Sequence, residues 1–420
     1  LRESLLARGG SRASNRFLGL LVAAQIAIGL VLVNAAALFL TSYSNVISQD
    51  LNFATDEVVV AGISLSGPAY REPHQRRAFY EELLVQMRSL PGVAHAGLTN
   101  KLPLRGGSNS YVLINDEVFE PSNQKERKLA EFSFIDDGYI EAMGIPLLAG
   151  RLFDSFDLEE SSAAAGLEIS PVELPVVINR TMAERMWPGE DPLGKIVRSY
   201  SAIEEFRARV VGVVGDVMQW GAEYPPLPEM YFPHTAEIWG PFGAQLVVRA
   251  ESDPHLVSAA IRDAVSEIDS QIPVADPSTM AEILRERTGR RRFSMVLIGL
   301  FAATALVLII AGTYGVMSFS VSQRTHEIGV RMALGANTFF VIRHFFARAG
   351  RLFVPGLILG LLGTFAVSGL MRNMVFGVSP LSLIHIATAA GAMVIVTSAA
   401  VAVPVLRATR VNPVEALKTE

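Results

Sequence analysis

The sequence predicts an integral membrane protein with four transmembrane helices and an α+β extracytoplasmic domain between the first and the second. Only 18% of the 420 residues are charged, against about 25% in average proteins. Charged residues are absent from four long apolar blocks. The 252 residues between the first two blocks are polar, contain prolines and are patterned like a folded domain.

Each apolar block is long enough to cross a bilayer, which takes roughly 20 residues of helix. Buried core helices are seldom this long and this uniformly apolar. The first block is also too long for the apolar region of a signal peptide, so we interpret it as a retained span. The predicted transmembrane helices are residues 17–40, 293–319, 352–371 and 381–406.

The orientation follows from lysine and arginine in the short loops. Four arginines lie in residues 1–16, five in 320–351 and three basic residues in 407–420, whereas the connection 372–380 has only Arg372. The three basic regions are therefore predicted to be cytoplasmic and the domain 41–292 to lie outside. One cluster before the second span departs from this rule: Arg285, Arg287, Arg290, Arg291 and Arg292.

The chain contains no cysteine. The outer domain must therefore be stable without disulfides, and thiolate metal sites and thiol catalysis are excluded. A domain of this length can bury a sufficient core.

The outer domain begins and ends with similar units of secondary structure. A strand at 57–65, a helix at 73–90 and a strand at 93–99 are predicted at the start. The helix has Phe79, Leu83 and Met87 on one apolar face. A strand at 245–250, a helix capped by Asp253 and a short strand at 272–274 are predicted at the end. We expect a split ferredoxin-like subdomain (41–129 and 241–292) interrupted by an inserted subdomain (130–240). A stalk helix, 277–290, would lead into the second span.

The inserted subdomain has weaker signals. Strands are expected at 131–135, 175–179 and 210–214, and helices at 138–143 and 180–187. Residues 155–174 are predicted to form a mobile surface loop. Four prolines indicate a loop-rich end: Pro225, Pro226, Pro228 and Pro233.

Two partial motifs resemble a phosphate-binding loop and a zinc site, but each lacks a required residue. Gly189 to Lys195 has the spacing of a phosphate-binding loop, but Ile196 stands where a serine or threonine is needed, so a glycine-rich turn is expected. His326 and Glu327 begin a zinc-binding pattern whose second histidine is replaced by Val330. No nucleophile–base pair stands out, and we predict no catalytic, nucleotide-binding, cofactor or metal residues.

The spans contain glycines and prolines with structural meaning. Gly356 and Gly360 have the spacing of a close helix-packing motif, although glycine is common in membrane helices. Pro355 and Pro404 would each bend a span.

The segment 322–336, SQRTHEIGVRMALGA, is a short charged helix between two spans. Glu327 and Arg331 form an i,i+4 pair, Gly335 ends the helix, and Asn337 can cap a basic amphipathic helix at 338–351. Two interpretations remain: an interfacial loop with arginines at the headgroups, or a docking helix for a cytoplasmic partner.

Residues 292–336 strongly resemble MacB/FtsX-type ABC transporter permeases. Further pieces similar to that family are WPGEDPLGK (187–195), RVVGVVGD (209–216), FGVSP (376–380) and ATRVNPVEAL (408–417). The resemblance extends over nearly the whole chain.

The resemblance implies a bacterial inner-membrane permease with its large domain in the periplasm. It also implies a cytoplasmic ABC ATPase that hydrolyses the ATP, and a second permease unit as a homodimer or as the other half of a duplicated chain. Motion driven by the ATPase would reach the periplasmic domain, a mode called mechanotransmission. The implied ATPase-coupling residues are Arg324, Glu327, Gly329, Arg331 and Gly335.

The chain looks most like one half of a duplicated orphan permease, with Leu1 to Gly10 as an inter-unit linker. Efflux or the handling of lipoproteins or peptides is the expected process. The alternatives are an FtsX-like regulator of a periplasmic or cell-wall partner, and a membrane-anchored sensor without an ATPase. No nucleic-acid partner is expected.

Overall fold

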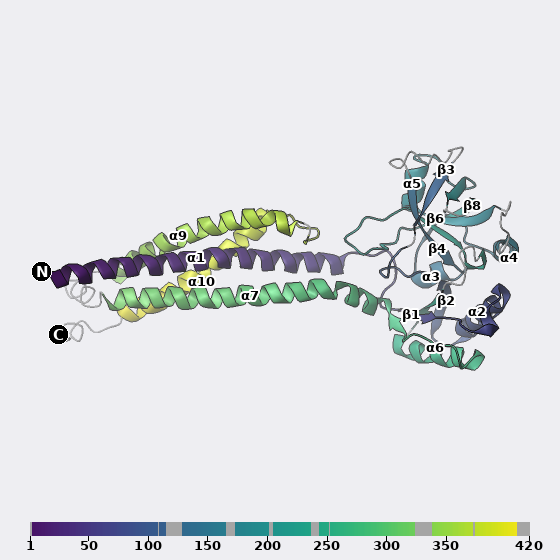
Figure 1. The fold of residues 1–420 in the computed structure, drawn as a ribbon, viewed down its shortest axis with the longest axis horizontal. Coiled ribbons are helices and arrows are strands. Elements are labelled where there is room, and N and C mark those ends of the chain that lie inside the picture. The colour runs from purple at the N-terminus through teal and green to yellow at the C-terminus, as the bar shows by residue number, and fades with distance from the viewer. Residues whose placement is uncertain are drawn as a thin grey trace. The chain divides into compact units, whose positions relative to one another are not determined.

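The computed structural model describes residues 2–107, 109–114, 128–164, 173–200, 205–236, 243–251, 253–323, 338–372 and 374–409. The chain divides into two compact units. The helical unit comprises residues 1–48 and 289–420, and the α+β unit comprises residues 49–288 (Figure 1).

The helical unit contains four long helices: α1 (Arg2–Ser48), α7 (Met280–Ser322), α9 (Thr338–Met371) and α10 (Leu383–Thr409). Within the described residues, four helical segments are long and apolar enough to cross a membrane: Phe17–Ser48, Met280–Ser322, Ile342–Met371 and Leu383–Arg407. The predicted spans agree with these helices, although α1, α7 and α9 continue beyond them. The helix predicted at 338–351 is continuous with the third span in α9. Pro355 lies inside α9 and Pro404 inside α10.

The first part of the α+β unit is a four-stranded antiparallel sheet in the order β11-β1-β10-β2. Its strands are β1 (Val58–Ile63), β2 (Val93–Thr99), β10 (Ala244–Ala250) and β11 (Ser278–Thr279). Two helices connect them, α2 (Pro73–Ser89) and α6 (Pro254–Ile268). Strands β1 and β2 flank the antiparallel β10, which is the split βαβ arrangement predicted from the sequence.

Helices α2 and α6 pack against this sheet through one apolar face each. On α2 the buried side chains include Phe79, Leu83 and Met87, at the helical spacing that the sequence indicated. On α6, Val257 and Ile261 are buried in the same core cluster. The Asp253 side chain accepts a hydrogen bond from the His255 amide and caps α6 as predicted.

The second part of the α+β unit is a closed ring of strands. Pairings run from β4 through β3, β7, β8, β6 and β9 back to β4. The ring strands are β3 (Asn109–Ile114), β4 (Lys128–Ile135), β6 (Leu174–Asn179), β7 (Ile196–Tyr200), β8 (Glu205–Val214) and β9 (Glu229–Pro233). The edge strand β5 (Leu147–Gly150) pairs with β8. The ring joins the first sheet through one pair, Thr99 with Ile135.

Two short helices belong to the ring part, α4 (Ser155–Ala164) and α5 (Arg180–Met186), whereas α3 (Tyr139–Met143) lies against β2 and β10 of the first sheet. Two 3-10 turns, Pro68–Tyr70 and His234–Ala236, complete the described elements. The Asn179 side chain caps α5 by accepting from the Met182 amide. The ring core is aromatic and aliphatic, with Trp187 2% exposed and Phe232 fully buried.

Several predictions for the α+β unit were wrong. The expected loop at 155–174 begins with α4, because Asp157 is buried and forms an ion pair with Arg151; residues 165–172 lie outside the described chain. The proline-rich end contains the buried strand β9, whose flanking Pro228 and terminal Pro233 avoid the strand interior. The expected strand at 272–274 is a single bridge between Val274 and Ile63.

The position of β3 also differs from the predicted domain boundary. That boundary, at residue 129, assigned residues 109–114 to the ferredoxin-like part. In the structure β3 pairs with β4 and β7 and therefore belongs to the ring. The strand was missed because its alternating pattern, NSYVLI, is short and polar at one end.

Candidate functional site

The predicted coupling residues Arg324, Glu327, Gly329, Arg331 and Gly335 lie outside the described residues, as do His326 and Asn337. Their interpretation stays a prediction. The structure does describe the helix ends on either side of this segment. Helix α7 ends at Ser322 and α9 begins at Thr338.

These helix ends pack together with the end of α10. Met317 and Val321 from α7, Phe345 from α9, and Val401 and Val405 from α10 form one buried cluster. One apolar core therefore holds the ends of α7, α9 and α10 together.

Helix α9 packs very closely on α1 through the predicted glycine motif. A Cβ atom at Gly356 would lie 2.7 Å from the Ala23 carbonyl oxygen, and one at Gly360 would lie 2.9 Å from Leu30 Cδ2. Such distances leave no room for a side chain. The two helices therefore approach each other as small-residue membrane pairs do.

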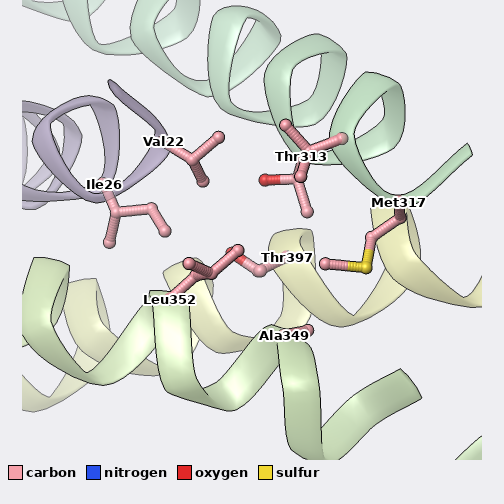
Figure 2. Close-up of a pocket in the computed structure, with 8 residues that line it drawn as sticks. Val22, Ile26, Thr313, Met317, Ala349, Leu352 and Thr397 are labelled. Atoms are coloured by element: carbon pink, nitrogen blue, oxygen red, sulfur yellow. The ribbon is translucent and has the colours of Figure 1, made fainter. Parts of the chain in front are cut away.

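A small cavity lies where all four long helices meet (Figure 2). Its lining is mostly apolar, with side chains from α1, α7, α9 and α10: Val22, Ile26, Thr313, Val316, Met317, Ala349, Leu352 and Thr397. The hydroxyls of Thr313 and Thr397 are buried and have no hydrogen-bond partner in the described part of the chain. With an accessible volume of about 10 Å³, the cavity is near the minimum size for one water molecule.

The C-terminal end of α1 is hydrogen-bonded to the loop between α9 and α10. Ser42 Oγ accepts a 2.7 Å hydrogen bond from the Phe376 amide, and Asn45 Nδ2 lies 3.3 Å from the Gly377 carbonyl oxygen. Thr41 Oγ1 is 3.0 Å from His385 Nε2. The predicted span carrying His385 is thus attached to α1 by a polar contact that the sequence did not reveal.

Helix α7 starts directly on the sheet of the α+β unit. Thr279, the last residue of β11, pairs with Val59 of β1 and also caps α7. The cap is reciprocal: the Glu282 amide donates to Thr279 Oγ1 (3.1 Å), and the Thr279 amide donates to Glu282 Oε2 (2.9 Å). Met280 is fully buried. The strand and the helix are therefore joined without a flexible linker.

A buried ionic cluster lies where the first sheet meets the ring. Lys101, just after β2, has its Nζ 3.1 Å from Glu131 Oε2 of β4 and 3.6 Å from Glu229 Oε1 of β9. Tyr231 donates a 2.9 Å hydrogen bond to Glu229 Oε2, and Gln219 donates to Glu229 Oε1. One lysine thus compensates two carboxylates that are both almost inaccessible.

A second ionic contact at the same junction joins α2 to the start of α3. Arg88 Nη2 is 2.7 Å from Asp136 Oδ2 and 2.7 Å from Asp137 Oδ1. Asp136 Oδ1 also accepts from the Leu98 amide at 2.7 Å. Burial raises the pKa of Asp136 to about 7, although the Leu98 amide and Arg88 act in the opposite direction. Both ionic contacts therefore lie where the first sheet meets the ring.

Two family models match the chain. The MacB-like periplasmic core domain matches residues 20–266, and the FtsX-like permease C-terminal matches residues 299–413. The chain belongs to the MacB/FtsX family of ABC transporter permeases. It is accordingly an inner-membrane protein whose large domain, the α+β unit, is periplasmic.

Curated members of the MacB/FtsX family show how much of a relative the chain spans. It is 26% identical over 307 residues to the macrolide export ATP-binding/permease protein MacB of Neisseria gonorrhoeae, covering 67% of this chain and 42% of that protein. It is 27% identical to the pyoverdine export ATP-binding/permease protein PvdT of Pseudomonas putida, covering 100% of this chain and 60% of that protein. The chain is 25% identical to the uncharacterized ABC transporter permease YvrN of Bacillus subtilis, covering 68% of this chain and 69% of that protein.

The glycine-rich turn of this permease has the structural role expected for it. Gly189 and Gly194 have positive φ angles of 78° and 75°. Lys195 Nζ is held 2.8 Å from Glu190 Oε2, and the Gly194 amide donates to the Val210 carbonyl. The segment therefore fastens the start of β7 to β8. No group of three or more metal-ligating side chains gathers among the residues that the structure describes.

The junction residues of the MacB/FtsX-type domain were missed by sequence reasoning. Glu131 lies within β4 and Glu229 is the first residue of β9, and both are followed by mostly apolar residues, FSFI and MYF. A carboxylate in such a strand is costly to bury unless it is paired. The pattern could therefore have indicated that each carboxylate has a buried cationic partner. It could not have indicated that this partner is Lys101.

Proposed function

We propose that this permease transmits motion from a cytoplasmic ABC ATPase across the inner membrane to its periplasmic domain. ATP hydrolysis takes place in that separate partner, which docks on Arg324, Glu327, Gly329, Arg331 and Gly335. A second permease unit, in a homodimer or in a duplicated chain, completes the assembly. The process served is efflux or the handling of lipoproteins or peptides.

The observation that supports the proposal is the continuity of α7. The helix begins at Met280, capped by the strand residue Thr279, and ends at Ser322, two residues before the first predicted coupling residue. A helix without a break is a stiff connection between its two ends. Buried packing at both ends, around Met280 and around Met317, favours transmission over local bending.

The composition of the spans gives further support. Residues 293–323, 352–371 and 381–406 contain no acidic residue, lysine or arginine. Ionisable residues inside transmembrane helices commonly mark ion pathways and proton relays. A protein that moves a domain on the far side needs none.

The stiffness of α7 can be tested in the full chain reconstituted with its ATPase. Because the chain has no cysteine, a single Val85→Cys label on exposed α2 reports the separation of two periplasmic domains. We expect ATP to change this distance. Inserting Gly-Gly after Arg292 should abolish the change, whereas the same insertion after Gly189, in a turn, should leave it intact. An unaltered response after the α7 insertion would contradict the proposal.

The docking site is tested separately by co-purification of the ATPase. Replacing Glu327 and Arg331 by alanine should remove ATPase binding. Arg372→Ala, in the short connection between α9 and α10, is the control and should not affect it. If ATPase binding survives the double replacement, the coupling assignment is wrong. If no nucleotide changes the periplasmic distance, a sensor without an ATPase replaces the transmission model.

A further inference from the structure

An arginine collar surrounds α7 just before its apolar segment. We define the collar as Arg285, Arg287, Arg290, Arg291 and Arg292, five arginines within eight residues. Four of them, all except Arg291, are exposed. The next residue, Phe293, begins a stretch of 31 residues without a charge. The collar therefore ends where the hydrocarbon core would begin.

The positive charge of the four exposed arginines of the collar is poorly compensated within the described part of the protein. In the described chain, Arg285, Arg290 and Arg292 form no ion pair with a carboxylate. Arg287 donates to the backbone oxygen of Trp220, which leaves its charge in place. Glu286 is the one acidic residue between Arg285 and Arg292. Unpaired guanidinium groups in a helix are suited to bind anions from outside the protein.

The collar is arranged around the helix and does not form a stripe. Arg285 and Arg292 are seven residues apart and project on one side. Arg287 and Arg290 project on the other side, at helical angles more than a quarter turn away from the first pair. A protein partner would contact one face of α7, whereas a layer of lipid headgroups contacts a helix from several directions. The arrangement favours the headgroup layer.

Membrane topology gives no reason for these arginines. The basic loops that set orientation are on the cytoplasmic side, and charge beside a long translocated domain has little influence on insertion. Guanidinium groups bind phosphate through paired hydrogen bonds, and basic residues next to a span are attracted to anionic lipids. We propose that the arginine collar binds the phosphate groups of anionic phospholipids in the periplasmic leaflet and so fixes the depth of α7 in the membrane.

The test uses the full chain in nanodiscs with a fluorophore on a single Gly289→Cys substitution. A Cβ atom at Gly289 would meet no atom within 4 Å, so a cysteine there should not disturb the helix. Headgroup-labelled phosphatidylglycerol, at trace level, should quench the fluorophore several-fold more strongly than equally labelled phosphatidylcholine. Arg290→Gln with Arg292→Gln should remove that difference.

The matched control removes the same charge elsewhere. Arg71→Gln with Arg180→Gln changes two exposed arginines of the periplasmic domain and should preserve the lipid preference. Excess inorganic phosphate distinguishes a lipid from a soluble anion: if it abolishes the preference, the collar is a site for soluble phosphate and the lipid assignment fails. A preference that persists in the Arg290/Arg292 variant, with normal helix content, would also overturn the proposal.

Discussion

Lys101 Nζ lies 3.1 Å from Glu131 Oε2 at the junction of the two periplasmic subdomains, and the two side chains are 9% and 2% exposed. Glu229, 3.6 Å from the same nitrogen, is 1% exposed. Removing the lysine would leave two buried carboxylates without a cation. Lys101→Met should therefore lower the free energy of unfolding of the periplasmic domain by about 3–5 kcal/mol, measured by chemical denaturation of the detergent-solubilised chain.

The control for this prediction is an exposed pair in the same domain. Lys195 and Glu190 are 2.8 Å apart, with side chains 38% and 60% exposed, so Lys195→Met should change stability by less than about 1 kcal/mol. Adding Glu131→Gln to Lys101→Met should recover part of the loss. Equal effects of the two lysine replacements would mean that the buried cluster is not a stabilising contact.

The glycine contact between α1 and α9 predicts a position-specific effect of alanine. Gly356→Ala places a methyl group against the Ala23 carbonyl oxygen and should destabilise the helical unit by about 1–3 kcal/mol. Gly369→Ala, in the same helix, meets no atom within 4 Å and should be neutral or stabilising. Thermal unfolding in lipid nanodiscs would show both effects, and a lower midpoint for Gly369→Ala alone would refute the packing argument.

The stability of the periplasmic domain should depend on pH through His234. Both ring nitrogens of His234 are buried, and burial lowers its pKa to about 4, below the ordinary value of 6.5. Between pH 6.5 and 4 the unfolded chain therefore binds a proton at this histidine that the folded domain does not bind, so the contribution of His234 to stability falls as the pH falls. Asp136, whose pKa is raised to about 7, contributes in the opposite direction over this window, so the variant is compared with the parent chain. His234→Phe should gain stability relative to the parent chain as the pH falls from 6.5 to 4, as followed by denaturation at several pH values. An unchanged slope would show that His234 is readily protonated in the folded domain.

The cavity among the four spans predicts different outcomes for two threonines. The Thr397 hydroxyl has no partner in the described chain, so Thr397→Val should maintain or raise the thermal midpoint in nanodiscs. Thr41 contacts His385 Nε2 at 3.0 Å, so Thr41→Val should cost about 1 kcal/mol. A loss of stability in Thr397→Val would instead indicate that a water molecule bridges this hydroxyl within the cavity.

The parts of the fold that sequence could predict are those governed by local pattern. Apolar length predicted the spans, and helical spacing of Phe79, Leu83 and Met87 predicted α2 and its buried face. The ring could not be predicted in the same way, because its closure depends on distant pairings such as Glu131 with Glu229. Strand β9 was not predicted because the prolines around it indicated a loop. The Lys101 cluster was not predicted because its three residues are far apart in the sequence.

The joint between β11 and α7 has a mechanical consequence. Thr279 is at once a paired strand residue and the cap of a helix that runs to Ser322. If α7 twisted about its own axis, the torque would reach the Val59–Thr279 pair within one residue and strain its backbone hydrogen bonds. The strand pair and the Thr279–Glu282 cap therefore resist a twist of the first turn of α7.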